Sequence, residues 1–110
     1  MNRKRRMMIL TEGNLGVFSS KTAISIMRYC PSETVCVLDS KAAHTGRSLE
    51  QIIGVGAGIP IVASVKDGLR FKPNQLVIGI APVGGLLPKA WRKIILEAIN
   101  SGLDIVSGLH

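Results

Sequence analysis

Short runs of apolar residues, separated by glycine- and proline-rich loops, recur along the whole chain. Continuous apolar runs, in contrast to alternating ones, are typical of strands buried on both faces of a parallel sheet. Between the first two runs, Ala23, Ile24, Met27 and Cys30 recur at helical spacing until Pro31. The pattern therefore predicts alternating strands and helices. The predicted strands cover residues 7–10, 34–38, 59–63, 75–80 and 103–107.

Further helix signals lie between the later strands. Ser64 and Asp67 are spaced like a capping box, which predicts a short helix after the third strand. Pro88 suits the first turn of a helix and Gly102 its C-terminal cap. Trp91 lies on the apolar face of this last helix, so we expect it in the core. Another short helix is predicted at 48–53, and residues 41–48 are predicted to form a mobile loop.

This order of elements predicts one α/β domain. With right-handed crossovers it gives a Rossmann-like open parallel five-stranded sheet, in the order 3-2-1-4-5, with helices on both faces. The domain would cover residues 7–110, after a basic tail at 1–6. Ligands of such sheets bind outside the carboxyl ends of the strands, where the strand order reverses. Loops rich in Gly, Ser or Pro lie at that edge, at 12–20, 39–47 and 81–87.

Composition supports a single domain with an aliphatic core. The chain has 110 residues, of which 46% are hydrophobic and only 4% aromatic. Its two cysteines, Cys30 and Cys36, fit neither a Cys-x-x-Cys redox pair nor a zinc site, which favours buried thiols in a reducing cytoplasm. The first apolar run is shorter than the roughly 7–15 residues of a signal peptide. No run approaches the roughly 18 residues of a membrane span, so we expect no membrane partner.

The chain is strongly basic, with a net charge of +7. Arg3, Lys4, Arg5 and Arg6 lie together before the first strand. Such a run can contact nucleic acid or an anionic surface, or it can be a solvated tail. We favour the solvated tail, and expect no nucleic-acid partner, because few aromatic residues accompany the charges and no nucleic-acid module is recognisable.

The glycine loop after the first strand is the principal candidate for ligand contact. Free backbone N–H groups and the partial positive charge at a helix N-terminus suit phosphate. A nucleoside-triphosphate P-loop is excluded, because it requires glycine where this chain has Leu15 and Ser20. The candidate ligand-binding residues of this loop are Gly13, Asn14, Gly16, Ser19, Ser20 and Lys21.

Two other loops at the same edge add candidates. Asp39 ends the second strand, where dinucleotide-binding folds place an acid that bonds a ribose hydroxyl. Capping of the following turn is the alternative role for this residue. Lys41 and Arg47 could reach a phosphate, or could simply be solvated. After the fourth strand, glycines permit close backbone approach, and the candidates are Pro82, Gly84 and Gly85.

The sequence carries no recognisable catalytic grouping. It has no Ser–His–acid arrangement, no metal-ligand cluster and no suggestively spaced pair of carboxylates. We therefore assign neither catalytic residues nor a metal site. The glycine-rich run at 54–58 precedes a strand, whereas a dinucleotide fingerprint follows one, so we interpret the run as backbone bends.

Several segments together carry a family resemblance. They are Thr11-Glu12-Gly13-Asn14-Leu15-Gly16, Val37-Leu38-Asp39-Ser40, Gly54-Val55-Gly56-Ala57-Gly58, Ile80-Ala81-Pro82-Val83-Gly84-Gly85 and Ser107-Gly108-Leu109-His110. This set resembles the N-terminal Rossmann-like domain of a bacterial and archaeal family of domains of unknown function. In that family a P-loop NTPase-like domain follows, and members are assigned as D-glutamate N-acetyltransferases. The resemblance implies that this chain is the N-terminal part of a larger protein, with that second domain as its partner.

The resemblance also implies a ligand class. From Ile59 onward the layout is similar to the CoA-binding domain of succinyl-CoA synthetases, so both resemblances are consistent with an acyl-CoA donor. Our main hypothesis is a domain that binds acetyl-CoA or another nucleotide-type ligand. One alternative is a structural module without a ligand, forming a homo-oligomer through Val83, Leu86 and Leu87. Another is an NAD-binding oxidoreductase domain, which rests on Asp39 and the fold.

Overall fold

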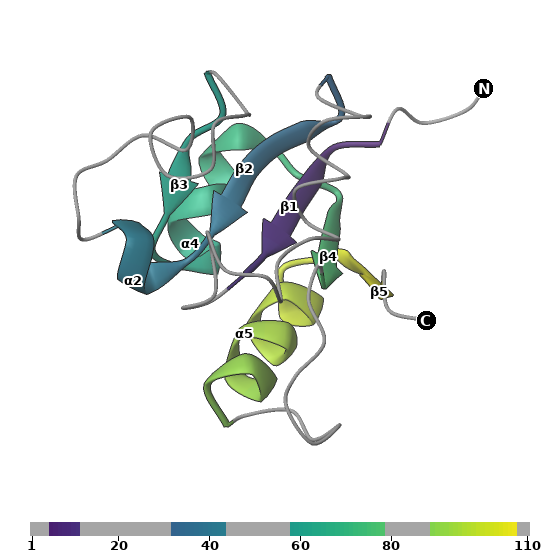
Figure 1. The fold of residues 1–110 in the computed structure, drawn as a ribbon. Helices are drawn as coiled ribbons and strands as arrows, with labels where there is room; N and C mark the ends of the chain where they lie inside the picture. Colours follow the sequence, from purple (N-terminus) through teal and green to yellow (C-terminus); the bar gives the residue numbers. More distant parts are fainter. Residues whose placement is uncertain (1–4, 12–31, 44–57, 79–88, 108–110) are drawn as a thin grey trace.

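The computed structural model of the chain describes residues 5–11, 32–43, 58–78 and 89–107 (Figure 1). Within them, five strands form one parallel sheet in the order β3-β2-β1-β4-β5. The predicted Rossmann-like fold class and strand order are confirmed. The strands are β1 (Met7–Leu10), β2 (Thr34–Leu38), β3 (Ile61–Val62), β4 (Gln75–Ile78) and β5 (Asp104–Ser107).

Strand β1 is the centre of the sheet. It pairs with β2 on one side and with β4 on the other, so its backbone is hydrogen-bonded along both edges. Its residues alternate between the two faces of the sheet, yet Met8, Ile9 and Leu10 are all fully buried. Burying one such side chain contributes roughly 1.5–3 kcal/mol. The continuous apolar run therefore reflects burial on both faces, as predicted.

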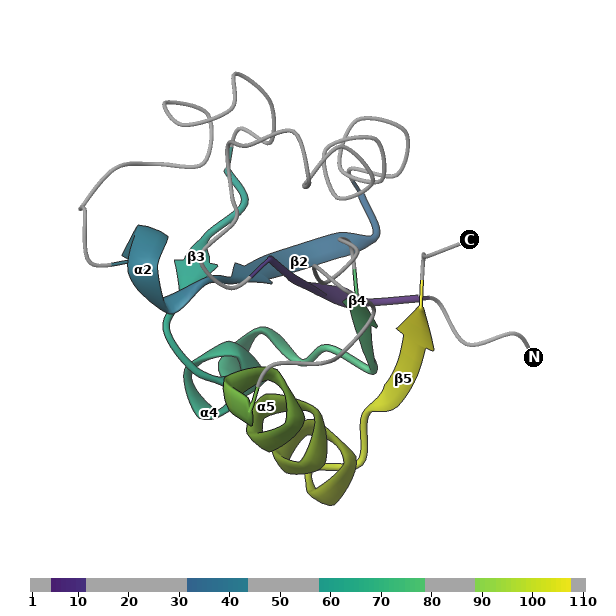
Figure 2. The ribbon, with the colours of Figure 1, turned by 60° about the horizontal axis from the view of Figure 1, so that its bottom comes forward.

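Among the described residues, two helices cover one face of the sheet, α4 (Val65–Gly68) and α5 (Lys89–Asn100) (Figure 2). Trp91 and Ala98 of α5 pack in one core cluster with Val65 of α4 and the facing side chains of the sheet. The core position predicted for Trp91 is confirmed. The helix predicted around residues 23–30 lies outside the described residues.

Two of the helix signals in the sequence, one at a helix start and one at a helix end, are confirmed by hydrogen bonds. The Ser64 hydroxyl oxygen accepts a bond of 3.1 Å from the Asp67 N–H, which caps α4. Gly102 has a φ of +86°, and the N–H after it, from Leu103, donates to the Ala98 carbonyl. Such a helix end needs a residue in the left-handed backbone conformation, and glycine adopts that conformation at little cost.

Some strands are shorter than predicted, because a backbone N–H that the sheet would need is missing or already bonded to another group. Strand β3 is shorter than the predicted 59–63, because Pro60 has no N–H and contributes only its carbonyl, to Val37. Strand β5 begins one residue later than predicted, because the N–H of Leu103 belongs to the helix cap. Residues 41–43, predicted to be in a mobile loop, belong to a one-turn helix, α2 (Ser40–Ala43). Asp39 stands directly before this turn, and Asp is a residue type that favours helix starts.

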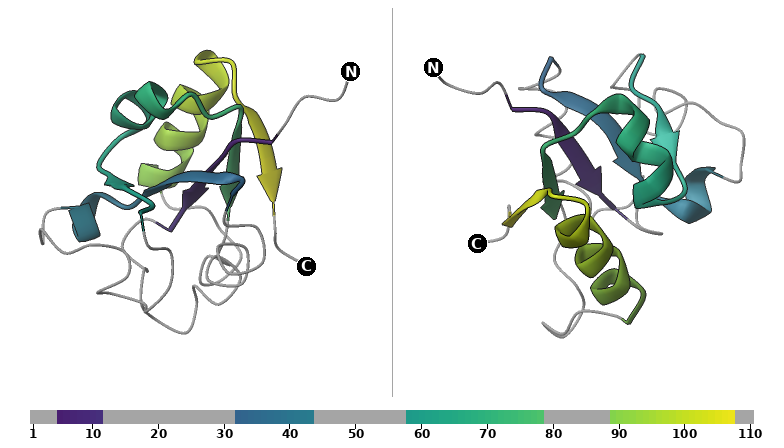
Figure 3. Two further views of the ribbon diagram at one scale, coloured as in Figure 1. Left: turned by 90° about the horizontal axis from the view of Figure 1, so that it is seen from above. Right: turned by 180° about the vertical axis from the view of Figure 1, so that it is seen from behind.

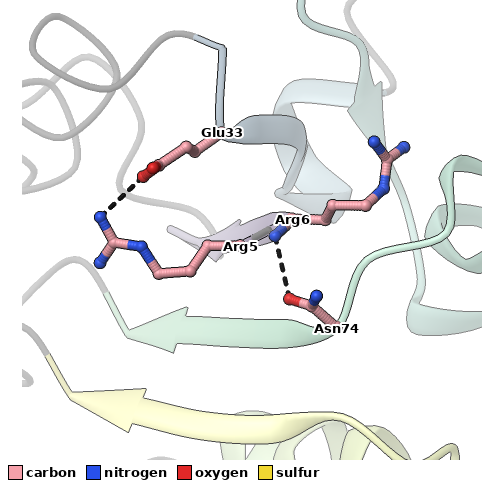
Figure 4. Close-up of polar contacts among 4 residues, drawn as sticks. All are labelled: Arg5, Arg6, Glu33 and Asn74. Atoms are coloured by element: carbon pink, nitrogen blue, oxygen red, sulfur yellow. Dashed lines mark hydrogen bonds and ion pairs between the residues drawn. The ribbon is translucent and has the colours of Figure 1, made fainter. Parts of the chain in front are cut away.

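Arg6 ties the amino-terminal edge of the sheet to the turn before β4 (Figure 4). Its N–H donates to Asn74 Oδ1 at 2.9 Å, and its guanidinium donates to the carbonyls of Phe71 and Lys72 at 2.6 and 2.8 Å. Lys72 has a φ of 57°, so these bonds hold a left-handed turn. Arg5 forms an ion pair of 2.7 Å with Glu33. These two arginines of the basic run therefore contact the body of the fold, and Arg3 and Lys4 lie outside the described residues.

The thiol of Cys36 is free and fully buried among the core side chains, as predicted. Burial raises its pKa from 9.0 to about 12. Because the thiolate is the reactive form of cysteine, this thiol is protonated and inert at neutral pH. Cys30 lies outside the described residues.

We expect substitutions of Arg5 and Arg6 to change the stability of the fold by different amounts. Replacing Arg6 by methionine removes its side-chain bonds to the Phe71 and Lys72 carbonyls, so we expect the free energy of unfolding to fall by about 1–3 kcal/mol. The matched variant Arg5→Met loses only an exposed ion pair, and we expect a change within about 0.5 kcal/mol. Urea unfolding of both variants measures the difference. Equal losses would contradict the role given to Arg6.

Candidate functional site

The candidate site is the edge of the sheet where the strands end. The arrowheads of β1, β2 and β4 point to the same side of the molecule (Figure 1). Strand β1 lies between β2 and β4, so the order of strands reverses beside it. Chain connections leave toward opposite sides of the sheet at such a point, and open α/β sheets bind ligands there.

A polar pair lies directly at this edge. The register pairs Leu10 of β1 with Leu38 of β2, so the next residues, Thr11 and Asp39, are neighbours. The Thr11 hydroxyl donates to Asp39 Oδ2 at 2.9 Å. Both residues are fully buried. A buried carboxylate is costly unless it accepts hydrogen bonds, and Thr11 supplies one.

Backbone hydrogen bonds fix the same pair to the sheet. The N–H of Thr11 donates to the Leu38 carbonyl at 3.1 Å, and the N–H of Asp39 donates to the Val62 carbonyl at 3.0 Å. The pair therefore links the ends of β1, β2 and β3. It sets the positions from which the chain leaves each of the first two strands.

Helix α2 begins immediately after Asp39 and lies beside β3 (Figure 1). Its Lys41 is exposed. A cationic side chain therefore stands on the element that follows β2 at the carboxyl edge. The helices α4 and α5 lie on one face of the sheet, as the view from behind shows (Figure 3).

The structure locates two of the residues predicted from sequence, Asp39 and Lys41. Asp39 lies at the end of β2, as predicted, and just before a helical turn, which agrees in position with both roles considered for it. Lys41 is the second residue of α2, which follows Asp39 directly. The other candidates fall outside the described residues, and for them the prediction stands as made. They are Gly13, Asn14, Gly16, Ser19, Ser20, Lys21, Arg47, Pro82, Gly84 and Gly85.

Thr11 is the site residue that sequence reasoning did not select. Its signal is positional, since it is the first polar residue after the apolar run of β1, as Asp39 is after β2. Parallel strands in register bring such residues together. Recognising the pair from sequence would have required the register between strands separated by more than twenty residues.

Within the described residues, no group of three or more His, Cys, Asp or Glu side chains is arranged to hold a metal ion. In the same part of the chain, no helix has the length and apolar character needed to cross a membrane. Buried side-chain nitrogen and oxygen atoms there all have a hydrogen-bond partner.

A solved structure closely matches this arrangement. The crystal structure of a DUF1611 family protein from Anabaena variabilis superimposes with a TM-score of 0.85 at 38% identity. The match covers 96% of this chain and 30% of that one. At this identity and coverage, the two chains share both fold and ancestry.

Two curated relatives match part of the chain. A D-glutamate N-acetyltransferase from a Pseudoalteromonas species is 45% identical over 47 residues, which is 43% of this chain and 14% of the relative. A D-glutamate N-acetyltransferase from Tritonibacter scottomollicae is 46% identical over 58 residues, 52% of this chain and 17% of the relative. The chain thus matches only a small part of the length of either relative.

A family model matches residues 42–110, and its description is a domain of unknown function, DUF1611_N, with a Rossmann-like fold. The matched region includes the second half of α2 and all of β3 to β5, and it takes up more than half of the chain. The family resemblance inferred from the sequence is therefore confirmed, and the chain belongs to the DUF1611_N family of Rossmann-like domains.

Proposed function

We propose that this domain binds a nucleotide-type ligand at the carboxyl edge of its sheet, and that acetyl-CoA is that ligand. The observation that carries the proposal is the site at the strand-order reversal, where β1 ends between β2 and β4 with a buried polar pair beside it. The names of the partly matching relatives, which are D-glutamate N-acetyltransferases, favour an acetyl donor as the occupant.

In this proposal the residues divide into two groups. Thr11 and Asp39 fix the ends of β1 and β2, and so they set the positions where the following loops begin. Backbone N–H groups of the predicted glycine loops, with Gly13, Gly16 and Gly84, would bind phosphate groups. Lys41 would add positive charge from α2.

We assign this domain a binding role, in a cytoplasmic acetyltransferase whose substrate is D-glutamate. The transfer step joins the acetyl group to the substrate amine and releases CoA, and we place its chemistry in the complete enzyme, with the P-loop NTPase-like domain as partner. The free, buried thiol of Cys36 supports a reducing compartment for such a protein.

Ligand binding should be visible as stabilisation. Thermal and urea unfolding of the protein should show stabilisation by acetyl-CoA and CoA, but not by NAD, ATP or D-glutamate. A ligand that binds only the folded state adds about 2.7 kcal/mol at a hundredfold excess over Kd. The variant Lys41→Ala should bind about fivefold more weakly, the effect of losing about 1 kcal/mol of attraction. Lys93→Ala, an exposed lysine of α5, is the matched control and should bind normally.

Other results of these unfolding measurements would favour a different function. Stabilisation by NAD alone would favour the oxidoreductase alternative. No stabilisation of a folded protein by any member of the panel would contradict the proposal and favour a structural module. If Lys41→Ala and Lys93→Ala weakened acetyl-CoA binding equally, Lys41 would not belong to the binding site.

The buried bond between Thr11 and Asp39 should be measurable as a coupling energy. Thr11→Val leaves the carboxylate without the hydroxyl donor, and we expect the free energy of unfolding to fall by about 1–3 kcal/mol. In a double-mutant cycle with Asp39→Leu, the two changes should couple by about 1 kcal/mol or more, because each removes the same buried bond. Additive losses in urea unfolding would show that the bond contributes little to the strand ends.

A further inference from the structure

The carboxylate of Asp39 is held inside the fold, although this residue stands where dinucleotide-binding sheets bind a ribose. In those sheets an acidic side chain at the end of the second strand accepts a hydrogen bond from a ribose hydroxyl. Here Asp39 is fully buried, and its Oδ2 accepts the bond of 2.9 Å from the Thr11 hydroxyl. Its N–H donates to the Val62 carbonyl. A carboxylate fixed in this way is not available to a ribose outside the fold.

The charged group that the same strand end presents to solvent is a cation. Lys41 lies two positions after Asp39, and it is exposed. Its helix, α2, follows β2 directly and contacts β3, so the backbone that carries Lys41 is fixed to the sheet (Figure 1). Among the described residues, no carboxylate forms an ion pair with the Lys41 ammonium group. The end of β2 therefore directs positive charge outward, while its acidic side chain is buried.

This arrangement of charges distinguishes two kinds of adenosine ligand. A ribose with free hydroxyl groups is bound by an outward acidic side chain, whereas a ribose that carries a phosphate is bound by a basic side chain nearby. An outward carboxylate would repel the phosphate, because both groups are negative. The ammonium group of lysine binds phosphate as a compact point charge. An acid held inside the fold beside an exposed lysine is the arrangement that suits the phosphorylated ribose.

We infer that the end of β2, with Lys41 exposed and Asp39 buried, selects a ligand whose adenosine ribose carries a phosphate. The inference rests on the proposed function, because it names the part of the ligand that lies at this strand end. The ribose of acetyl-CoA carries a 3′-phosphate, and this is the group that Lys41 binds. NADP carries the same kind of group on the neighbouring ribose oxygen, whereas NAD does not.

A comparison of acetyl-CoA with 3′-dephospho-acetyl-CoA isolates the ribose phosphate, because the two compounds differ in that group alone. Calorimetric titration of the wild-type chain should give a Kd about fivefold lower for acetyl-CoA, which corresponds to about 1 kcal/mol. Lys41→Ala should bind the two compounds equally, with its affinity for the dephospho compound unchanged. Lys41→Arg should keep the preference. Lys93→Ala, on α5, is the matched control and should keep it too.

Phosphorus NMR tests the contact itself. The signal of the 3′-phosphate should shift when acetyl-CoA saturates the wild-type chain, and it should shift much less with Lys41→Ala. The diphosphate signals should shift with both proteins. Added salt should reduce the preference for acetyl-CoA over the dephospho compound, because the preference depends on an exposed charge. Titration with NADP and NAD distinguishes the second source of a ribose phosphate.

The possible results separate this inference from the proposed function. Equal affinity of the wild-type chain for acetyl-CoA and its dephospho form would overturn the inference and leave the proposed function standing. A preference that Lys41→Ala retains would also overturn it. Tighter binding of NADP than of both NAD and acetyl-CoA would support selection of a ribose phosphate, while contradicting acetyl-CoA as the ligand. A folded protein that binds none of these compounds would contradict the proposed function, and this inference with it.

Discussion

The structure depends on one constraint, which is that β1 has neighbours on every side. Its backbone is paired along both edges and its side chains are buried on both faces. A strand in that position must be apolar throughout, and it must align with β2 and β4 in one register. The register then decides which polar residues meet where the strands end. The Thr11–Asp39 pair at the candidate site is thus a consequence of how the core is built.

The two edges of the sheet are tied in different ways. At the amino-terminal edge, Arg6 binds the turn before β4 through Asn74 and two carbonyls, so a side chain closes the gap between sequence-distant segments. At the carboxyl edge, Thr11 and Asp39 fix the strand ends from inside the fold. With both ends held, the segments that follow the strands start from fixed positions. Loops on such a fixed base can vary in sequence and carry function.

The strands and their order were predictable from sequence, because continuous apolar runs in a chain of alternating elements are typical of a buried parallel sheet. The bounds of β1 and β2 were also predicted correctly, whereas both ends of β3 and the start of β5 were not, since these depend on single hydrogen bonds. Pro60 has no N–H to donate to the ladder with β2, and the N–H of Leu103 is committed to the Ala98 carbonyl in the helix cap. The role of Thr11 was missed for the same reason, as it depends on the register with β2. For Asp39 the predicted place was right, while its hydroxyl partner came only from the structure.

The central claim is that ligand binds at the carboxyl edge, and the most direct measurement is an NMR titration of the isotope-labelled protein with acetyl-CoA. We expect saturable shifts in the amide signals of Thr11, Ser40 and Lys41, which lie at that edge. The amide signals of Arg6 and Asn74, at the opposite edge, should stay unchanged. Shifts centred on Arg6 and Asn74, or no shifts in a folded protein at saturating ligand, would contradict the claim.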